Sequence, residues 1–310
     1  MTRQVVAQAY GGPDVLAVRH VELPGPGPEQ VLLTVRAAGT NPFDYKIYSG
    51  DMGDDPDRLP MPLGSEVCGV VAEASARIAG YTGALKVGDE VIATGVTGAY
   101  ADQVVVDADQ VGHKPATLTP EEAAGLLLTG GTAWHLLTKT DVGTDDVVLI
   151  HGAGGGVGQM AVQLAVARGA TVIATASAGR HEQLRRLGAQ PVEYGVGLAD
   201  RVRALGAPTV ALDLVGTDEA LNVSTELVAD RARIASIAAF ARGPELGIAV
   251  LTGADGGQAI RDAARPELIK LAAAGQLKVS VDRMFPLEQA ADAHRYLQTG
   301  HARGKVVLVP

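Results

Sequence analysis

The chain has 310 residues, of which 47% are hydrophobic and 20% are charged, and its formal net charge is −9. This composition is typical of two globular domains and not of a disordered chain. The acidic balance argues against a nucleic-acid surface or a polybasic membrane patch, so the expected partner is a small molecule. A single cysteine, Cys68, excludes an intrachain disulfide and a multi-cysteine metal site, which favours a cytoplasmic compartment.

Two segments bear on secretion and membranes. The opening stretch MTRQVVAQAYGGPD lacks the apolar core of a signal peptide. The weakly charged run 147–167 contains His151, Gln159, Gln163 and a glycine cluster, which favours a buried strand, turn and helix over a membrane span. We therefore expect no membrane partner.

Residues 1–118 have the pattern of a small, barrel-like β domain. Short β-type runs are separated by tracts rich in Gly, Pro and Asp, and they predict strands over 31–37, 67–72, 90–93 and 101–106. The pattern changes after Lys114. The next segment predicts a helix.

That helix has a well-marked start. Thr119 is suited to cap it and Pro120 to occupy its first position, and Glu121 and Glu122 then face the positive end of the helix dipole. We interpret the two glutamates as helix-start residues and not as catalytic acids.

Residues 119–260 alternate between strand and helix patterns. Strands are expected over 147–150, 171–175, 210–214 and 232–238. Alternation of this kind predicts βαβ units and a doubly wound parallel sheet. The remaining residues, 261–310, predict helices over 266–277 and 287–300 and a last strand over 305–310.

A glycine-rich turn joins the first of these strands to its helix in HGAGGGVGQMAVQLAVARGA (151–170). The pattern G-x-G-x-x-G has alanine at its first position, Ala153. The strand before the turn and the helix after it nevertheless favour a dinucleotide-binding turn over a purely structural one. Small residues let the backbone approach a pyrophosphate, and the first helical N–H groups point at the anion. The expected cofactor contacts are Gly154, Gly155, Gly156, Val157 and Gly158.

The segment after the second strand of this domain favours NADP over NAD. No acidic residue precedes Glu182, although an acid at this place is what binds the ribose hydroxyls of NAD. Ser177 offers a hydroxyl and Arg180 a guanidinium for a 2′-phosphate, and Tyr194 is a further candidate for the same pocket. The alternative for Arg180 is a solvated residue at a helix start.

Several motifs in one order resemble the medium-chain dehydrogenase/reductase superfamily, and within it the zinc-free quinone oxidoreductases related to zeta-crystallin. They are AAGTNPFDYKIYSG (37–50), LPMPLGSEVCGVV (59–71), KVGDEVIA (86–93), GAYADQVVV (98–106), the glycine turn and RGKVVL (303–308). The resemblance implies a GroES-like β-barrel catalytic domain, to which residues 261–310 return, and a Rossmann domain between the two segments. It also implies a substrate cleft against the nicotinamide. A homodimer is expected.

The sequence departs from the zinc-bearing relatives at their metal ligands. Those relatives carry Cys at the position of Asn41 and His-Glu at the position of Ser65-Glu66. Asn and Ser are poor zinc ligands, so we expect no metal. No G-x-S-x-G elbow, C-x-x-C pair or Walker loop occurs in the sequence, which leaves hydrolase, dithiol and P-loop chemistry without support.

Loss of zinc restricts the acceptors that are chemically reasonable. Zinc stabilises an alkoxide in alcohol oxidation. Quinones and α,β-unsaturated carbonyls need only hydrogen-bond donors to their oxygen as hydride arrives. We therefore expect an NADPH-dependent reductase of these acceptors. Two alternatives stay open, namely an enoyl thioester reductase and an NADPH-binding sensor without turnover.

Candidate catalytic residues lie in the segment NPFDYK. Asn41 is expected to hydrogen-bond the nicotinamide or the acceptor. Lys46 is expected to orient the cofactor or to donate to the substrate oxygen, with a surface lysine as the alternative, and Tyr45 either lines the cleft or anchors the core. By the resemblance alone, Thr129, Ile237 and Ala238 match cofactor-lining positions. His151 is interpreted as a packing residue.

Overall fold

The computed structural model describes residues 1–254 and 256–310. These residues form two compact units, each with its own core. The first consists of Met1–Leu128, Ile269–Gly275 and Val279–Pro310, and the second of Thr129–Leu268 and Gln276–Lys278.

The first unit extends past the domain boundary predicted at residue 118, because the short helix α2 (Pro120–Ala123) packs on the strands of this unit. An ideal Cβ atom at Gly39 would lie 2.3 Å from the carbonyl oxygen of Ala124, so only glycine permits this close approach. The predicted cap is present. Thr119 Oγ1 accepts from the Glu122 N–H and the Glu122 carboxylate accepts from the Thr119 N–H.

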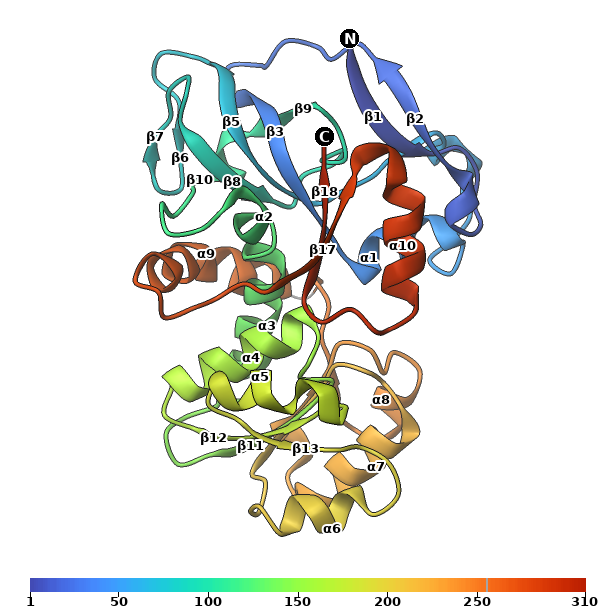
Figure 1. Cartoon of the computed structure of the whole chain (residues 1–310), viewed down its shortest axis with the longest axis vertical. Coiled ribbons are helices and arrows are strands. Elements are labelled where there is room, and N and C mark those ends of the chain that lie inside the picture. Colours follow the sequence, from blue (N-terminus) through green and yellow to red (C-terminus); the bar gives the residue numbers. More distant parts are fainter. Residues whose placement is uncertain (255) are drawn as a thin grey trace. The chain divides into compact units, whose positions relative to one another are not determined.

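Antiparallel pairing dominates the first unit (Figure 1). The main sheet has the order β10-β8-β5-β3-β18-β17, with β9 also paired to β3. The smaller sheets are β2-β1-β4 and β6-β7. The strands are β1 (Thr2–Ala7), β2 (Leu16–Val21), β3 (Gln30–Thr40), β4 (Met61–Pro62), β5 (Glu66–Ala74), β6 (Ala79–Gly80), β7 (Gly83–Ala84), β8 (Glu90–Thr94), β9 (Gln103–Asp107), β10 (Val111–His113), β17 (Val281–Pro286) and β18 (Lys305–Val309). The other helices of this unit are α1 (Pro42–Ser49) and α10 (Ala290–Gln298), with 3-10 turns at Pro13–Val15, Pro56–Arg58, Ala108–Gln110 and Leu287–Gln289.

The end of the chain returns to the first unit as β18. This strand pairs antiparallel with β3, with Val306 opposite Thr40, and parallel with β17. Helix α10 packs beside both strands (Figure 1). The core joins residues from both ends of the chain, from Val5 and Leu33 to Val306 and Leu308. The first and last segments of the chain therefore share one hydrophobic core.

The second unit is built on a parallel sheet of order β13-β12-β11-β14-β15-β16. Its strands are β11 (Val147–His151), β12 (Thr171–Thr175), β13 (Gln190–Val192), β14 (Val210–Asp213), β15 (Ile234–Ser236) and β16 (Ala249–Val250). Its helices are α4 (Gly156–Ala167), α5 (His181–Arg186), α6 (Leu198–Arg203), α7 (Asp218–Leu227), α8 (Arg242–Glu245) and most of α3 (Leu127–Lys139) and α9 (Gly257–Ala273), with 3-10 turns at Ala178–Arg180 and Arg231–Arg233. The strand order reverses between β11 and β14, and ligands of such sheets bind outside the carboxyl ends of the strands at this point.

Several elements differ from the sequence-based prediction, and β1 and β2 are among the strands that it did not include. Helix α9 begins at Gly257, well before the predicted start at residue 266, and contains Pro266. Ala264, Leu268 and Ala272 are buried at helical spacing, and this packing outweighs the helix-breaking tendency of the proline. Strand β17 was not predicted. No helix in the described part of the chain is long and apolar enough to cross a membrane.

Candidate active site

The glycine turn closes tightly between β11 and α4. Gly152 has a φ of +72°, so the left-handed position lies one residue before the start of the G-x-G-x-x-G pattern. Ala153 is fully buried and donates its N–H to the Thr175 carbonyl oxygen at 3.2 Å. Alanine is tolerated at the first pattern position because the special backbone conformation falls on Gly152.

Two of the remaining glycines of the turn are closely approached, Gly158 by backbone atoms and Gly154 by the Arg180 side chain. An ideal Cβ at Gly158 would lie 2.5 Å from the Gly152 carbonyl oxygen, and one at Gly154 would lie 2.3 Å from Cδ of Arg180. Gly155 is the extended residue before α4, and Gly155, Gly156 and Val157 are only half-buried. The turn therefore presents the free N–H groups of the first helical turn, a geometry that fits a pyrophosphate.

The structure brings the predicted phosphate residues to the same edge of the sheet. Arg180 Nη1 donates to the Gly154 carbonyl oxygen at 2.7 Å, which fixes the guanidinium against the turn. Ser177 precedes the 3-10 turn Ala178–Arg180 and is half-buried. Tyr194 is 57% exposed and follows β13, whose Val192 pairs with Thr175 of β12. Arg180 is therefore bonded to the turn and half-buried.

No acid takes the position that selects NAD. Glu182, the first acid after β12, lies in α5 and forms an exposed ion pair with Arg186. Its carboxylate is thus engaged on the outer face of the helix. The residues that follow β12 instead include the Ser177 hydroxyl and the Arg180 guanidinium, and both groups suit a 2′-phosphate.

The three other predicted cofactor residues lie in two places: Ile237 and Ala238 follow strand β15, and Thr129 lies in helix α3. Ile237 and Ala238 come directly after β15, where the Ile237 N–H donates to the Asp213 carbonyl oxygen and the Ala238 N–H donates to Ser236 Oγ. Thr129 is buried in α3. The expected strand 232–238 is shorter than predicted, so Ile237 and Ala238 lie in a loop at the carboxyl edge.

Two buried polar residues occupy the carboxyl ends of β11 and β14, where His151 pairs in register with Asp213. The Asp213 carboxylate accepts the Ser236 hydroxyl at 2.5 Å and the backbone N–H groups of Val215 and Gly216. Burial lowers the pKa of His151 to about 4, which keeps the imidazole neutral. This arrangement agrees with the interpretation of His151 as a packing residue.

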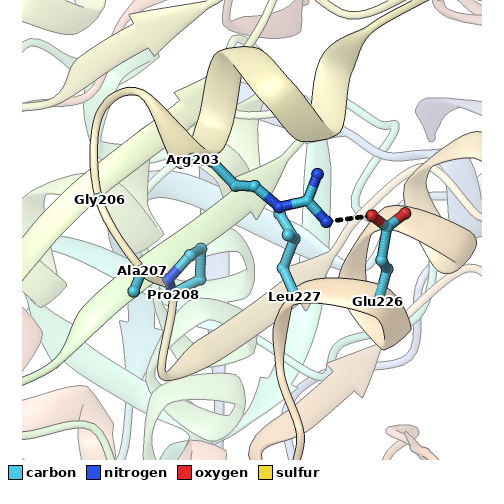
Figure 2. Close-up of a pocket in the computed structure, with 6 residues that line it drawn as sticks. All are labelled: Arg203, Gly206, Ala207, Pro208, Glu226 and Leu227. Carbon is cyan, nitrogen blue, oxygen red and sulfur yellow. Dashed lines mark hydrogen bonds and ion pairs between the residues drawn. The ribbon is translucent and has the colours of Figure 1, made fainter.

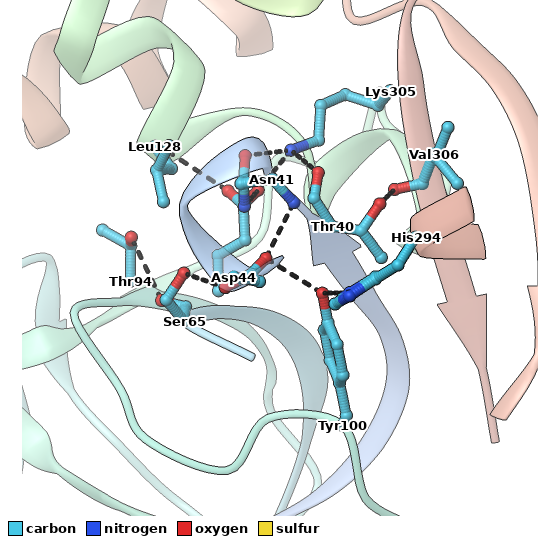
Figure 3. A network of polar contacts seen from close by, with 11 residues as sticks. Thr40, Asn41, Asp44, Ser65, Thr94, Tyr100, Leu128, His294, Lys305 and Val306 are labelled. Atoms are coloured by element: carbon cyan, nitrogen blue, oxygen red, sulfur yellow. Dashed lines mark hydrogen bonds and ion pairs between the residues drawn. The ribbon is translucent and has the colours of Figure 1, made fainter. Parts of the chain in front are cut away.

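In the first unit, Asn41 lies at the centre of a buried polar network (Figure 3). It caps α1, and its N–H donates to Asp44 Oδ2 at 2.7 Å. Asn41 Nδ2 donates to Glu66 Oε1 at 2.9 Å, and Asn41 Oδ1 accepts from Lys305 Nζ at 2.7 Å. Lys305 Nζ also donates to Glu66 Oε1 at 2.5 Å and to the Thr40 carbonyl oxygen at 3.0 Å.

Asp44 connects this network to a chain of buried aromatic residues. Tyr100 donates to Asp44 Oδ2 at 2.9 Å and lies 3.1 Å from His294 Nε2, and Tyr48 lies 2.7 Å from His294 Nδ1. Because Tyr100 uses its proton on Asp44, the neutral imidazole carries its proton on Nε2 and accepts from Tyr48. Ser65 Oγ donates to Asp44 Oδ1 at 3.2 Å. Burial raises the pKa of Asp44 to about 6, although hydrogen bonds from Tyr100 and the Asn41 N–H oppose the rise.

Lys46 and Tyr45 lie farther along α1, and both are half-buried. Tyr45 packs against the hydrophobic core, and its ring lies edge-on to that of His294 with 6.3 Å between the ring centroids. Burial raises the pKa of its phenol. This contact favours the core-anchor interpretation of Tyr45. Lys46 lies in the last turn of the helix. The cation bonded to Asn41 is Lys305 and not Lys46.

Glu66 and Lys305 were not among the predicted site residues, although their positions carried a signal. Each charge starts an apolar strand, EVCGVV and KVVLV, and both side chains are nearly fully buried. Buried charges occur in proteins almost only as pairs. A carboxylate and an ammonium at the starts of two buried strands therefore suggest each other as partners.

Asn41 and Ser65, the residues that the sequence resemblance matches to metal ligands of zinc-bearing relatives, bind Glu66, Lys305 and Asp44. Across residues 1–254 and 256–310, no three His, Cys, Asp or Glu side chains are placed to hold a metal ion together. The polar atoms at this position are thus engaged with other side chains.

A surface hollow of about 500 Å³ lies elsewhere in the second unit (Figure 2). It is lined by the Arg203–Glu226 ion pair, Leu227 and residues 206–208. Residues 206–208 precede β14, so the hollow lies at the amino ends of the strands. The glycine turn is at their carboxyl ends, and the hollow is therefore separate from the candidate cofactor site.

Sequence comparison places both units in known families. The alcohol dehydrogenase GroES-like domain family matches residues 27–116, and the zinc-binding dehydrogenase family matches residues 187–308. A quinone oxidoreductase of Pseudomonas aeruginosa is 33% identical, with all of both chains covered. The chain belongs to the zinc-free quinone oxidoreductases of the medium-chain dehydrogenase/reductase superfamily. The predicted family and the predicted fold class, a GroES-like β-barrel with a Rossmann sheet, are thereby confirmed.

Two further relatives extend the comparison. The chloroplastic NADPH-dependent alkenal/one oxidoreductase of Arabidopsis thaliana is 30% identical over 97% of this chain and 78% of its own. The crystal structure of Escherichia coli quinone oxidoreductase complexed with NADPH superposes with a TM-score of 0.86 at 28% identity and covers all of both chains. The relatives of this chain thus include a quinone oxidoreductase and an alkenal/one oxidoreductase.

Proposed function

We propose that this protein is a zinc-independent reductase that transfers hydride from NADPH to a quinone or an α,β-unsaturated carbonyl compound. The observation that carries the proposal is the Asn41 network. It holds an amide between two buried charges, and the sequence resemblance matches this residue to a metal ligand of zinc-bearing relatives. Membership of a family with quinone and alkenal/one reductases supports the same conclusion.

The glycine turn and its neighbours fit the cofactor. NADPH, when bound, supplies the hydride. The N–H groups at the start of α4 bind its pyrophosphate, and Arg180 and Ser177, with Tyr194 nearby, bind the 2′-phosphate. Thr129, Ile237 and Ala238 are proposed to line the rest of the cofactor site.

Asn41 is the proposed catalytic residue. Hydride addition to a quinone or an enone leaves negative charge on the acceptor oxygen, and a fixed N–H donor stabilises that charge. Asn41 Nδ2 supplies the donor without a metal. Lys46 is proposed to orient the nicotinamide ribose or to donate a second hydrogen bond to the acceptor.

Two measurements on the purified protein test the function. Fluorescence titration should show binding of NADPH, and NADPH oxidation should then follow addition of 9,10-phenanthrenequinone or a small enone. Binding without oxidation of either acceptor would favour a sensor protein. Oxidation with a crotonyl thioester only would favour an enoyl thioester reductase.

A third measurement tests the absence of a catalytic metal. We expect activity to survive exhaustive EDTA treatment, because the side chains at the former ligand positions are engaged with Glu66, Lys305 and Asp44. Metal analysis before and after the treatment is the control. One zinc per chain, lost together with activity, would refute the expectation.

We further propose that the protein is a cytoplasmic homodimer. In the second unit β16 is the terminal strand of the parallel sheet, and β15 is its neighbour within the sheet order. Such an edge is open to pairing with a second copy. Light scattering during size-exclusion chromatography should give twice the chain mass, and the single chain mass would contradict the dimer.

A further inference from the structure

The ammonium group of Lys305 is fully occupied inside the first unit. Lys305 is 3% exposed, and its Nζ donates to three acceptors, the Thr40 carbonyl oxygen, Asn41 Oδ1 and Glu66 Oε1. An ammonium has three N–H donors, so none is left for a substrate. Any effect of Lys305 on the reaction must therefore pass through another residue.

The charges of Lys305 and Glu66 distinguish the two ends of the Asn41 amide. The amide oxygen faces the ammonium at 2.7 Å, and the amide nitrogen faces the carboxylate at 2.9 Å. Rotating the amide by half a turn would place NH₂ against NH₃⁺ and oxygen against a carboxylate. In a buried site both contacts would be strongly repulsive. One orientation of the amide is therefore fixed.

The surrounding backbone prevents the charged side chains from moving aside. An ideal Cβ at Gly125 would lie 2.6 Å from Cγ of Lys305, and one at Gly39 would lie 2.4 Å from Glu66 Oε1. Glu66 Oε2 also accepts the Leu128 N–H at 3.3 Å. Lys305 itself is held by the pairing of β18 with β3. The ion pair is thus a rigid frame for the amide.

We propose that Lys305 and Glu66 are positioning residues that orient Asn41 so that its second Nδ2 hydrogen is directed to the acceptor oxygen. The first Nδ2 hydrogen is used on Glu66, and the second has no acceptor among the residues that the structure describes. Hydrogen bonding of the amide oxygen to an ammonium also polarises the amide and strengthens its remaining N–H donor. This inference rests on the proposed function, because it assigns the donor of that reaction.

A charge-neutral double variant separates positioning from simple charge balance. Lys305→Met together with Glu66→Gln removes both charges and keeps similar volumes, so no unpaired charge stays buried. The neutral amide introduced at position 66 can hydrogen-bond the Asn41 amide in either orientation. The double variant therefore no longer favours one orientation of the Asn41 amide over the other. We expect turnover of a small enone to fall roughly ten- to a hundred-fold, with an unchanged Michaelis constant for NADPH. Quinone turnover should fall less.

The matched control removes another buried lysine of the same unit. Lys114 has a side chain that is 5% exposed, pairs with Glu90 and bonds the Leu118 carbonyl oxygen. Lys114→Met with Glu90→Gln should leave the enone turnover unchanged. In addition, the Lys305/Glu66 double variant should have no further effect on turnover in an Asn41→Ala background. A full additional loss there would overturn the inference.

A spectroscopic measurement tests the positioning without any turnover. The sequence contains two asparagines, Asn41 and the exposed Asn222, so selective ¹⁵N labelling gives two side-chain NH₂ signals. Asn41→Ala assigns them. We expect the Asn41 signals of the wild type to be shifted and protected from exchange with water, and to approach those of Asn222 in the double variant. Identical Asn41 signals in wild type and double variant would overturn the inference, whereas an inactive wild type would refute only the proposed function.

Discussion

Single charged residues determine both proposed sites. Lys305 places a positive charge beside Asn41, and Arg180 places one beside the glycine turn. The two are held differently. Lys305 is buried and fully bonded, so it acts through Asn41, whereas Arg180 is half-buried and can meet a phosphate directly.

Arg180 provides the residue-scale prediction. Arg180→Ala should raise the Michaelis constant for NADPH and leave the Michaelis constant for NADH nearly unchanged. The expected loss of NADPH binding free energy is about 1.5 to 3 kcal/mol, the value of a charged hydrogen bond. Steady-state kinetics with both cofactors measure this. Arg186→Ala is the control, because Arg186 pairs with Glu182 on the exposed face of α5. Equal losses for NADPH and NADH would show that Arg180 only supports the turn through Gly154.

At the scale of elements, the packing of α4 on the end of β11 decides whether the turn can form. Gly158 lies where helix and turn touch, and any side chain there meets the backbone of Gly152 and Ala153. Backbone atoms cannot rotate away as a flexible side chain can. The cost of substitution must therefore appear in stability as well as in cofactor binding.

Gly158→Ala should lower the free energy of unfolding by about 1 to 3 kcal/mol and weaken NADPH binding. Urea denaturation and fluorescence titration measure the two effects. Gly179→Ala is the control, since nothing lies within 4 Å of a Cβ at that position and its φ is not in the left-handed region. If Gly158→Ala proves as stable as this control, the close approach is not essential to the turn.

Elements defined by neighbouring residues could be predicted from the sequence, whereas elements defined by distant partners could not. The cap at Thr119 and the turn before α4 depend on residues within a few positions of each other. The Glu66–Lys305 pair spans 239 positions, and only the pairing of β18 with β3 brings the two together. Strand β17 was missed because its residues show no alternation of buried and exposed positions, and because its strand partner, β18, lies farther along the chain. Asn41 was among the predicted site residues, but the Glu66–Lys305 ion pair that is bonded to it was not.

At the scale of the whole molecule, buried neutral histidines link stability to pH. Burial lowers the pKa of His294 to about 4, against 6.5 for an unperturbed histidine. Between these pH values the unfolded chain binds the additional proton, so stability falls as the pH falls through this window. His151 contributes with the same sign. Asp44 contributes with the opposite sign, because its raised pKa of about 6 means that the folded state binds a proton first.

His294→Gln isolates one of these contributions. A glutamine in this place can still bond Tyr48 and Tyr100, but it cannot titrate. Lowering the pH from 7.5 to 5 should destabilise the wild type by about 2 kcal/mol more than the variant, as measured by urea denaturation at both pH values. Equal pH dependence of the two proteins would show that His294 is not held neutral by burial.

The most direct test of the central claim follows the hydride itself. NADPH carrying deuterium in both C4 positions of the reduced nicotinamide should be oxidised by a small enone, and mass spectrometry of the saturated ketone should show one deuterium on the β-carbon. That result would establish hydride transfer from the cofactor to an activated alkene. A saturated product with hydrogen from water at the β-carbon, or a protein that binds NADPH and reduces neither enone nor quinone, would contradict the account.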